Sequence, residues 1–374
     1  MRIALLTRRF DPHGGGTERD LIVTAEFLAR AGHEITIYAA EIRKPSAQWK
    51  VRRVGPRLPL GRAVSLMRFA YGAARMARRD GAELVVSFAR ALDADVLRSG
   101  GSAHASYLRA ARKWRGRTGT ATMRLTPYHQ AQMLIERRAF TSPRLKAAVA
   151  VSTLVRYELI REFGLAPERT VTIYNGVDLD RFRPAADNTD REMVRAHYRI
   201  PADARVVIFV GNGFARKGLG ALIDAWPSLA GEPYLLVVGS DNASATYGNR
   251  AYQLGVTQRV VFAGAQPNVE ALFHAADAFA MPSMFEPFGN VVMEAMASGL
   301  PVLTSEQSGV QELVPREMRP FVVENPDDPS EVALRLGLLL DSRESLGTLA
   351  RAAAEQHPWD RYGKELVALI DSLA

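Results

Sequence analysis

Short apolar runs alternate with longer helical patterns along this 374-residue chain, and no other feature restricts its possible folds as strongly. In the first half, the runs that predict strands are residues 3–7, 34–38, 83–88, 147–152 and 171–174. Helical patterns such as residues 17–31 lie between them. Since most of these runs are continuously apolar, they indicate strands of a parallel sheet that helices cover on both faces.

The pattern starts again after a polar stretch at residues 181–190. The second set of predicted strands comprises residues 206–210, 234–238, 260–263, 278–282, 301–304 and 320–323. The chain is long enough for two domains of common size. We therefore expect two Rossmann-like, doubly wound α/β domains, at residues 1–178 and 179–355.

The last helical pattern, residues 356–374, has an apolar face. The residues on this face are Leu366, Leu369, Ile370 and Leu373. Such a face needs an apolar partner. We expect this helix to pack back onto the first domain.

Each predicted domain opens with a strand that runs into a glycine-rich turn, at residues 14–16 and 211–213. In a doubly wound sheet this turn lies at the carboxyl edge of the strands, where ligands bind. We expect two such edges to face each other across a cleft. Neither turn has the G-x-G-x-x-G spacing with a following acidic residue, so we expect no nicotinamide or flavin cofactor.

The composition excludes several classes of chemistry. The chain has no cysteine, which excludes disulfides, thiolate nucleophiles and thiolate metal ligands. No apolar stretch reaches the ~20 residues that cross a bilayer, and the apolar run at the amino terminus is too short for a signal peptide. We expect a cytoplasmic protein.

Charge is distributed unevenly between the two halves. Residues 1–180 contain 31 Lys+Arg and 16 Asp+Glu, a net charge of +15, whereas residues 181–374 contain 17 and 24, a net charge of −7. This asymmetry indicates an anionic partner for the first half, such as nucleic acid, acidic lipid or a phosphorylated acceptor.

The most specific motif runs from Glu286 to Glu294 and reads EPFGNVVME. A strand is predicted to end near residue 282, and a helix is predicted to begin near Gly289. The N–H groups at a helix start bind anions, and a diphosphate is a natural ligand there.

This stretch resembles the Glu-x7-Glu donor-binding motif of retaining GT-B glycosyltransferases of family 4. The resemblance implies that Glu286 bonds hydroxyls of the donor sugar and that Glu294 bonds the nucleotide ribose. It also implies that the residues around the helix start line the donor site. These residues are Phe288, Gly289, Asn290 and Val291.

A second motif, GNGFARKG at residues 211–218, places two cations before a predicted helix. Arg216 and Lys217 can neutralise a departing diphosphate without a metal ion. The family usually has a basic residue after the first glycine, and Asn212 departs from that pattern. We expect Arg216 to supply the missing charge, an arrangement similar to bacterial lipopolysaccharide core glucosyltransferases.

In the first domain, the resemblance implies that the loop with Gly15 and Gly16 closes over the donor phosphates. Arg19 and Asp20 are candidates for the acceptor side, and for Asp20 a favourable interaction with the helix dipole is an equal alternative. His104 follows a predicted strand and short helix. Many relatives place a histidine near the donor sugar at this point, although a single histidine is often structural.

No metal site is predicted. Asp93 and Asp95 imitate the Asp-x-Asp metal motif of another glycosyltransferase fold, but they lie in residues 89–97, which we interpret as a helix without a paired ligand. His13 is expected at the surface.

Residues 98–138 carry nine basic residues and one acidic residue, Glu136. Large side chains are interleaved with these charges, at Tyr107, Leu108, Trp114, Met123 and Leu125. This composition is typical of a segment on an anionic membrane surface, and an RNA-binding arm has the same composition. The resemblance to lipid-acting enzymes favours peripheral contact with the inner face of the cytoplasmic membrane.

Together these features predict transfer of a hexose from a nucleotide diphosphate sugar to a lipopolysaccharide-core, glycolipid or other saccharide acceptor. We expect a UDP-linked donor. The family implies retention of anomeric configuration, with the departing phosphate taking the acceptor proton. Two alternatives remain open. One is a nucleotide-sugar epimerase or hydrolase of the same fold, and the other is a basic nucleic-acid-binding protein.

Overall fold

The computed structural model describes residues 1–12, 14–55 and 61–373, so His13 lies outside the described residues. The chain forms two compact units. Unit 1 comprises Met1–Gly176 and Trp359–Ala374, and unit 2 comprises Val177–Pro358. The chain therefore leaves unit 1 after Gly176 and returns to it at Trp359. The bounds predicted from the sequence were residue 178 for the end of the first domain and residue 356 for the return.

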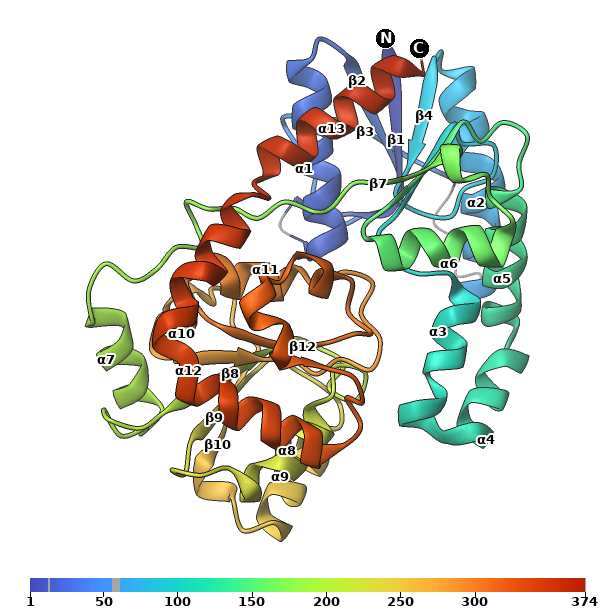
Figure 1. Cartoon of the computed structure of the whole chain (residues 1–374). Helices are drawn as coiled ribbons and strands as arrows, with labels where there is room; N and C mark the ends of the chain where they lie inside the picture. Colours follow the sequence, from blue (N-terminus) through green and yellow to red (C-terminus); the bar gives the residue numbers. More distant parts are fainter. Residues whose placement is uncertain (13, 56–60, 374) are drawn as a thin grey trace. The chain divides into compact units, whose positions relative to one another are not determined.

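Unit 1 contains a sheet of seven parallel strands in the order β3-β2-β1-β4-β5-β6-β7 (Figure 1). The strands are β1 (Arg2–Phe10), β2 (Glu34–Ile42), β3 (Lys50–Arg53), β4 (Leu84–Ser87), β5 (Val96–Ser99), β6 (Ala147–Ala150) and β7 (Thr170–Thr172). The central strands are buried on both faces, because apolar side chains on each face meet helices.

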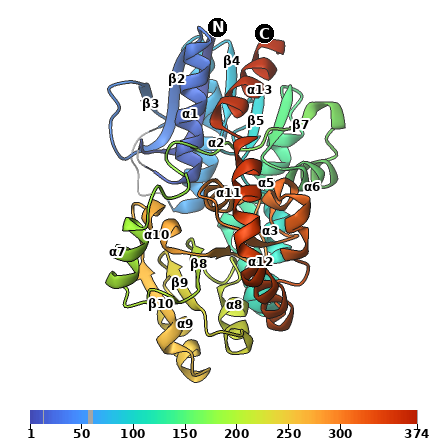
Figure 2. The same ribbon diagram turned by 60° about the vertical axis from the view of Figure 1, so that its left-hand side comes forward.

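Helices of unit 1 pack against this sheet or against one another. They are α1 (Gly16–Arg30), α2 (Arg62–Arg79), α3 (His104–Ala110), α4 (Arg112–Leu125), α5 (Pro127–Phe140), α6 (Thr153–Phe163) and α13 (Trp359–Ser372). The carboxyl-terminal helix α13 lies beside α1 in both views (Figures 1 and 2). Its residues Tyr362, Leu366 and Ile370 enter the core around β1 and α1.

Residues 89–97 do not form the predicted helix. They form a turn that leads into β5. Asp93 has φ 61°, a left-handed conformation that aspartate tolerates better than most residues. The Asp95 carboxylate accepts hydrogen bonds from the Val85 N–H (2.8 Å) and from Arg78 (2.9 Å), so tertiary contacts replace the helical ones.

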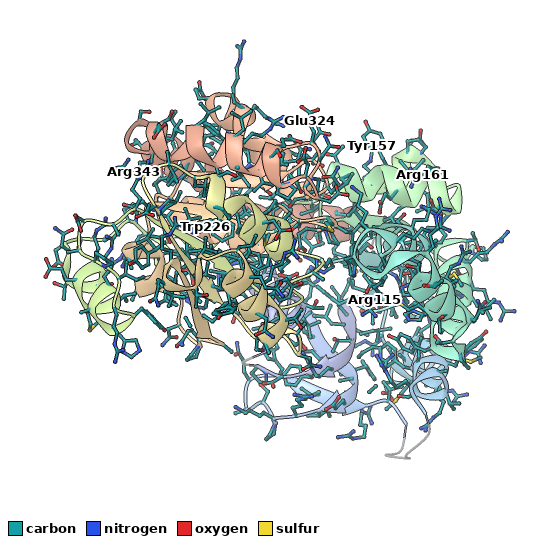
Figure 3. The ribbon with its side chains drawn as sticks, turned by 90° about the horizontal axis from the view of Figure 1, so that it is seen from below. Arg115, Tyr157, Arg161, Trp226, Glu324 and Arg343 are labelled. Atoms are coloured by element: carbon teal, nitrogen blue, oxygen red, sulfur yellow. The ribbon has the colours of Figure 1, made fainter. Side chains whose placement is uncertain are left out.

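Unit 2 contains six parallel strands in the order β10-β9-β8-β11-β12-β13. They are β8 (Val206–Val210), β9 (Tyr234–Val238), β10 (Val260–Gly264), β11 (Ala278–Ala280), β12 (Val302–Ser305) and β13 (Val322–Val323). The helices are α7 (Thr189–His197), α8 (Leu219–Ala225), α9 (Ser244–Gln253), α10 (Glu270–Ala275), α11 (Asn290–Ala297) and α12 (Pro329–Glu355). Trp226, labelled in Figure 3, is buried within unit 2, and its indole N–H donates to the Pro233 carbonyl (2.8 Å).

Both units therefore confirm the predicted class of two Rossmann-like α/β folds with parallel sheets. In unit 2 the strand order reverses between β8 and β11, which are neighbours. The loops that follow these two strands emerge at the same carboxyl edge, at the point where doubly wound sheets bind ligands. Within the described residues, no helix is both long enough and apolar enough to cross a membrane.

Candidate functional site

The loop after β8 depends on glycine. Gly211 has φ 148°, and a Cβ there would lie 2.7 Å from Cδ of Lys217. Gly218 has φ 80°, and a Cβ there would lie 1.9 Å from the carbonyl oxygen of Pro282. Because neither position has room for a side chain, the β8 loop packs directly against the end of β11 and Lys217 lies over Gly211.

Glu286 joins the two predicted motifs of unit 2 through ion pairs. Its Oε2 atom lies 3.1 Å from Nζ of Lys217 and 2.9 Å from Nη1 of Arg216. Arg216 also donates to the Phe285 carbonyl (2.8 Å). Lys217 is only 9% exposed, and its Nζ contacts Sδ of Met281 at 3.2 Å. One carboxylate thus pairs with two cations at the carboxyl edge of the sheet, and the group keeps a net positive charge.

This arrangement determines the ionisation of Glu286. Burial alone would raise the pKa of the carboxyl, but the charges of Lys217 and Arg216 outweigh burial and lower its pKa below the ordinary 4.5. Glu286 is therefore ionised at neutral pH. Its pairing stabilises the fold above pH 4.5, and this contribution is lost as the pH falls through the lowered pKa.

The backbone around Glu286 is held by the segment that follows β12. The Glu286 N–H donates to the Gln307 carbonyl, and the Gly309 N–H donates to the Glu286 carbonyl, both at 2.9 Å. Phe288 is buried, and its carbonyl accepts from the Ser308 hydroxyl at 2.9 Å. These bonds fix the loop that carries the first glutamate of the motif.

Helix α11 begins directly after this loop. Gly289 precedes it with φ 108°, and among the described residues no side chain caps this end. The helix start carries a partial positive charge that favours an anion. Asn290 and Val291, at the first positions of the helix, are partly exposed.

Glu294 lies one turn further along α11 and is half-buried. Its charge acts on Arg181. The hydrogen bond from Arg181 to Glu270 raises the pKa of Arg181, and the charge of Glu294 raises it further. Sequence reasoning missed Arg181 and Glu270, since nothing in their local sequence connects them with the motif.

Asn212 is exposed, and its side-chain oxygen accepts from the Ser240 N–H at 2.8 Å. It therefore links the loops after β8 and β9 and adds no charge. The cations that the structure brings to Glu286 are Arg216 and Lys217, which the sequence predicted to neutralise a diphosphate.

In unit 1, the glycine turn leads directly into α1. Gly15 is the residue before the helix, Gly16 is its first residue, and both are exposed. The space around Gly15 is open, since an added Cβ would meet nothing within 4 Å. Arg19 is half-buried in the first turn, and its N–H donates to the Gly15 carbonyl at 3.0 Å.

Asp20, a candidate for the acceptor side or for pairing with the helix dipole, has an interior position. It is 3% exposed and lies 3.0 Å from Nη2 of Arg98, which is also buried. Arg98 also donates to the Tyr362 hydroxyl (3.1 Å) and to the side-chain oxygen of Asn175. Burial raises the pKa of Asp20 despite the opposing effect of Arg98. The carboxylate therefore joins α1 to β5 and α13 rather than meeting a ligand at the surface.

His104 is the first residue of α3 and contacts α5 at two points. Its backbone N–H donates to Glu136 (2.7 Å), and its ring Nε2 shares a 2.7 Å hydrogen bond with Nδ1 of His129. Burial lowers the pKa of His104, and the charges of His129 and Arg90 lower it further against the opposing effect of Glu136. His104 is therefore neutral at neutral pH.

Sequence reasoning missed Arg90, His129 and the structural role of Glu136. The buried Glu136 pairs with Arg90 at 3.0 Å, and Arg90 also bonds Ser99 at 2.9 Å. The available signal was that Glu136 is the one acidic residue in a basic segment.

Within the described part of the chain, no group of three or more histidine, aspartate or glutamate side chains is arranged to hold a metal ion. Asp95 forms an ion pair with Arg78 in the turn described above, and Asp93 lies in the same turn.

Two family models match this chain. Residues 14–181 match glycosyltransferase family 4, and residues 190–356 match the glycosyl transferases group 1. Together these models span most of the chain, one in each unit. The chain belongs to this family of glycosyltransferases, and its fold is GT-B.

Among curated relatives, a D-inositol 3-phosphate glycosyltransferase of Corynebacterium efficiens is 28% identical over 395 residues, covering 95% of this chain and 91% of the relative. An uncharacterized glycosyltransferase of Methanocaldococcus jannaschii is 30% identical over 227 residues. That match covers 59% of this chain and 58% of the relative. The chain therefore spans less than two thirds of the length of that relative.

Among solved structures, WaaG, a glycosyltransferase involved in lipopolysaccharide biosynthesis, has a TM-score of 0.82 at 22% identity and covers 98% of this chain and 99% of its own. Anabaena HepE in complex with UDP and glucose has a TM-score of 0.74 at 19% identity, and the match covers 100% of both chains. At these identities the likeness shows the fold.

Proposed function

We propose that this protein is a retaining glycosyltransferase that transfers a hexose from a UDP-linked sugar to a saccharide or glycolipid acceptor. The observation that carries the proposal is the ion-paired group of Glu286, Arg216 and Lys217 beside the start of α11. A donor diphosphate has the charge to bind these two cations and the helix start. HepE, which has the same fold, binds UDP, and this supports the choice of nucleotide.

Each residue has a role in this proposal. The diphosphate binds Lys217, Arg216 and the N–H groups at the start of α11. Glu286 then accepts hydrogen bonds from the sugar hydroxyls, and Glu294 accepts them from the ribose. Gly15 lies in open space before α1, where an anionic ligand has room.

Transfer proceeds on one face of the sugar. The bond between the anomeric carbon and the phosphate oxygen breaks, the acceptor oxygen forms the new bond on the same face, and its proton passes to the departing phosphate. Lys217 and Arg216 stabilise the charge that develops on that phosphate. Because two cations are already placed there, we propose that no metal ion is required.

A panel of nucleotide sugars tests the proposed donor. Thermal unfolding should shift upward with the correct donor, since a ligand at a hundred times its Kd stabilises the native state by about 2.7 kcal/mol. The shift and the transfer of sugar should both persist in EDTA. A requirement for manganese or magnesium would contradict the proposed phosphate site, and epimerised or hydrolysed donor without transfer would support the alternative enzymes.

The proposed acceptor is a lipopolysaccharide-core or other glycolipid saccharide at an anionic membrane surface. WaaG is involved in lipopolysaccharide biosynthesis, and unit 1 contains most of the positive charge of this chain. Helix α4 presents exposed cations on its surface, including Arg115 in Figure 3. The exposed cations of α4 are Arg112, Lys113, Arg115, Arg117 and Arg124.

The structure revises the apolar part of this surface. Leu125 is 79% exposed at the end of α4, as a membrane contact requires, whereas Leu108 is buried in unit 1. Tyr107 and Trp114 are half-buried against each other, with ring centroids 6.0 Å apart. Gly116 has a non-helical conformation (φ 71°) that bends α4.

Vesicle binding should follow this surface. The protein should bind vesicles that contain anionic lipid and should dissociate as salt increases, because each surface cation contributes about 1 kcal/mol and salt screens it. Cosedimentation at low and high salt measures this, with neutral vesicles as the control. Equal binding to neutral vesicles would contradict the proposal, and tighter salt-dependent binding to RNA would favour the nucleic-acid alternative.

A further inference from the structure

Helix α5 holds His104 at both its backbone and its ring. Glu136 and His129 are seven residues apart, two turns of helix, and therefore lie on the same face of α5. That face meets the start of α3, where the two helices lie side by side (Figure 1). The Glu136 carboxylate fixes the backbone N–H of His104, and His129 contacts its ring.

The contact between the two rings is specific. The rings lie edge to edge and nearly in one plane, with centroids 4.9 Å apart and an interplanar angle of 16°, and Nε2 of His104 lies 2.7 Å from Nδ1 of His129. A hydrogen bond between two neutral imidazoles contains one proton. Within the described residues, the second ring nitrogen of His104, Nδ1, has no hydrogen-bond partner.

We infer that His129 is a positioning residue that fixes the ring orientation and tautomer of His104 and leaves Nδ1 of His104 to contact the substrate. This inference rests on the proposed function, and the family resemblance implies that a histidine at this point of the chain lies near the donor sugar. The hydrogen bond couples the tautomers of the two rings. When Nε2 of His104 donates, its Nδ1 is an acceptor, and when Nε2 accepts, its Nδ1 is a donor.

The surroundings keep both rings neutral. His104 faces Glu136 and Arg90 and stacks on Tyr107 at 5.8 Å. His129 faces Arg62 from α2 and Arg115 from α4. Burial lowers the pKa of His129, and the charges of these two arginines lower it further. The ring of Tyr128 lies edge-on to His129. A proton added to His129 would create an imidazolium near the charges of Arg62 and Arg115, so the pair stays neutral and the shared hydrogen bond persists at neutral pH.

Two variants separate the hydrogen bond from the packing. His129→Phe keeps an aromatic ring at this position and removes the hydrogen bond. His129→Asn has an amide near the position of Nδ1 and restores a hydrogen bond that does not titrate. The exposed His197 of unit 2 gives a matched control, His197→Asn.

Transfer by His129→Phe should show a kcat about tenfold lower with the KM for donor nearly unchanged, and His129→Asn should recover most of this loss. The acid limb of the pH profile should move to higher pH in both variants, because the pKa of His104 rises without His129 as a charged neighbour. Equal losses in both variants that follow their thermal stability, with an unchanged pH profile, would show a structural role only and overturn the inference.

Nitrogen-15 NMR of the imidazoles tests the pair without any reaction. In the wild-type protein, His104 should show one dominant tautomer, and His129→Phe should give a mixture of tautomers. A mixture already present in the wild type would overturn the inference. If the NMR result is as expected but no nucleotide sugar is bound or transferred, the proposed function is wrong. The positioning of His104 by His129 would still be supported.

Discussion

Replacing Glu286 with glutamine should reduce sugar transfer by about a hundredfold while strengthening the binding of the bare nucleoside diphosphate. Transfer falls because Glu286 orients the sugar, and a misplacement of ~1 Å can cost on the order of a hundredfold in rate. Binding strengthens because Glu286 is paired with Lys217 and Arg216 in the free protein. Its charge opposes a diphosphate that needs the same cations. About a tenfold gain in affinity corresponds to 1.4 kcal/mol.

From the two motifs alone, the expected affinity of this variant for nucleoside diphosphate is unchanged. The ion pairs seen in the structure alter that expectation and give the result a definite sign. Calorimetric titration with UDP measures it, and Glu317→Gln, at an exposed position, serves as a charge-matched control. Weaker UDP binding by Glu286→Gln would show that Glu286 contacts the nucleotide rather than the sugar.

Glu294→Ala should have the opposite effect on the nucleotide. If Glu294 accepts hydrogen bonds from the ribose, its removal weakens both UDP and the intact donor by about tenfold or more, since a hydrogen bond to a charged group is worth roughly 1.5–3 kcal/mol. The two glutamates of one motif are thus distinguished by the direction in which UDP affinity changes. The same direction in both variants would contradict the assigned roles.

Arg98→Met should destabilise unit 1 by about 3–5 kcal/mol, the usual result of removing one partner from a buried ion pair. Arg98 is 1% exposed and is paired with Asp20, so the substitution leaves a buried carboxylate without its cation. Differential scanning calorimetry should show a lower transition for unit 1, with the transition of unit 2 as the internal control.

The double variant Asp20→Asn/Arg98→Met should recover part of this loss, because it removes the buried charge as well. The loss in Arg98→Met should also decrease on acidification. The pKa of Asp20 is already raised by burial, and it rises further without Arg98. A protonated carboxyl is stable in the interior, so the stability of the variant decreases as the pH rises through that pKa. A double variant less stable than Arg98→Met would contradict this explanation.

Local patterns in the sequence were sufficient for the class of fold and for the motifs of unit 2. Strands such as residues 206–210 and 234–238 were predicted at the bounds that β8 and β9 have. Continuous apolar runs are specific because each residue must be buried on one face or the other of a covered sheet. The Glu-x7-Glu motif was equally visible, since its loop and helix start are continuous in sequence.

Tertiary structure alone determined the partners of these residues. The interpretation of residues 89–97 as a helix was wrong because Arg78 and the Val85 N–H bind Asp95 and hold the turn before β5. For Asp20 the acceptor side and the helix dipole remained equal alternatives, because no local pattern reveals that Arg98 pairs with it in the core. Periodicity reports which side of an element is apolar but does not identify the residue it meets.

The same limit applies at the functional site. The sequence by itself determined that Glu286, Arg216 and Lys217 are present, each in its own motif. Only the packing of the β8 loop against the end of β11, across glycines with no room for a side chain, brought the two cations to one carboxylate oxygen. Likewise, the sequence contains His104 and His129 as two separate histidines. Their shared hydrogen bond exists because α3 and α5 pack together, and such contacts depend on the chain folding in three dimensions.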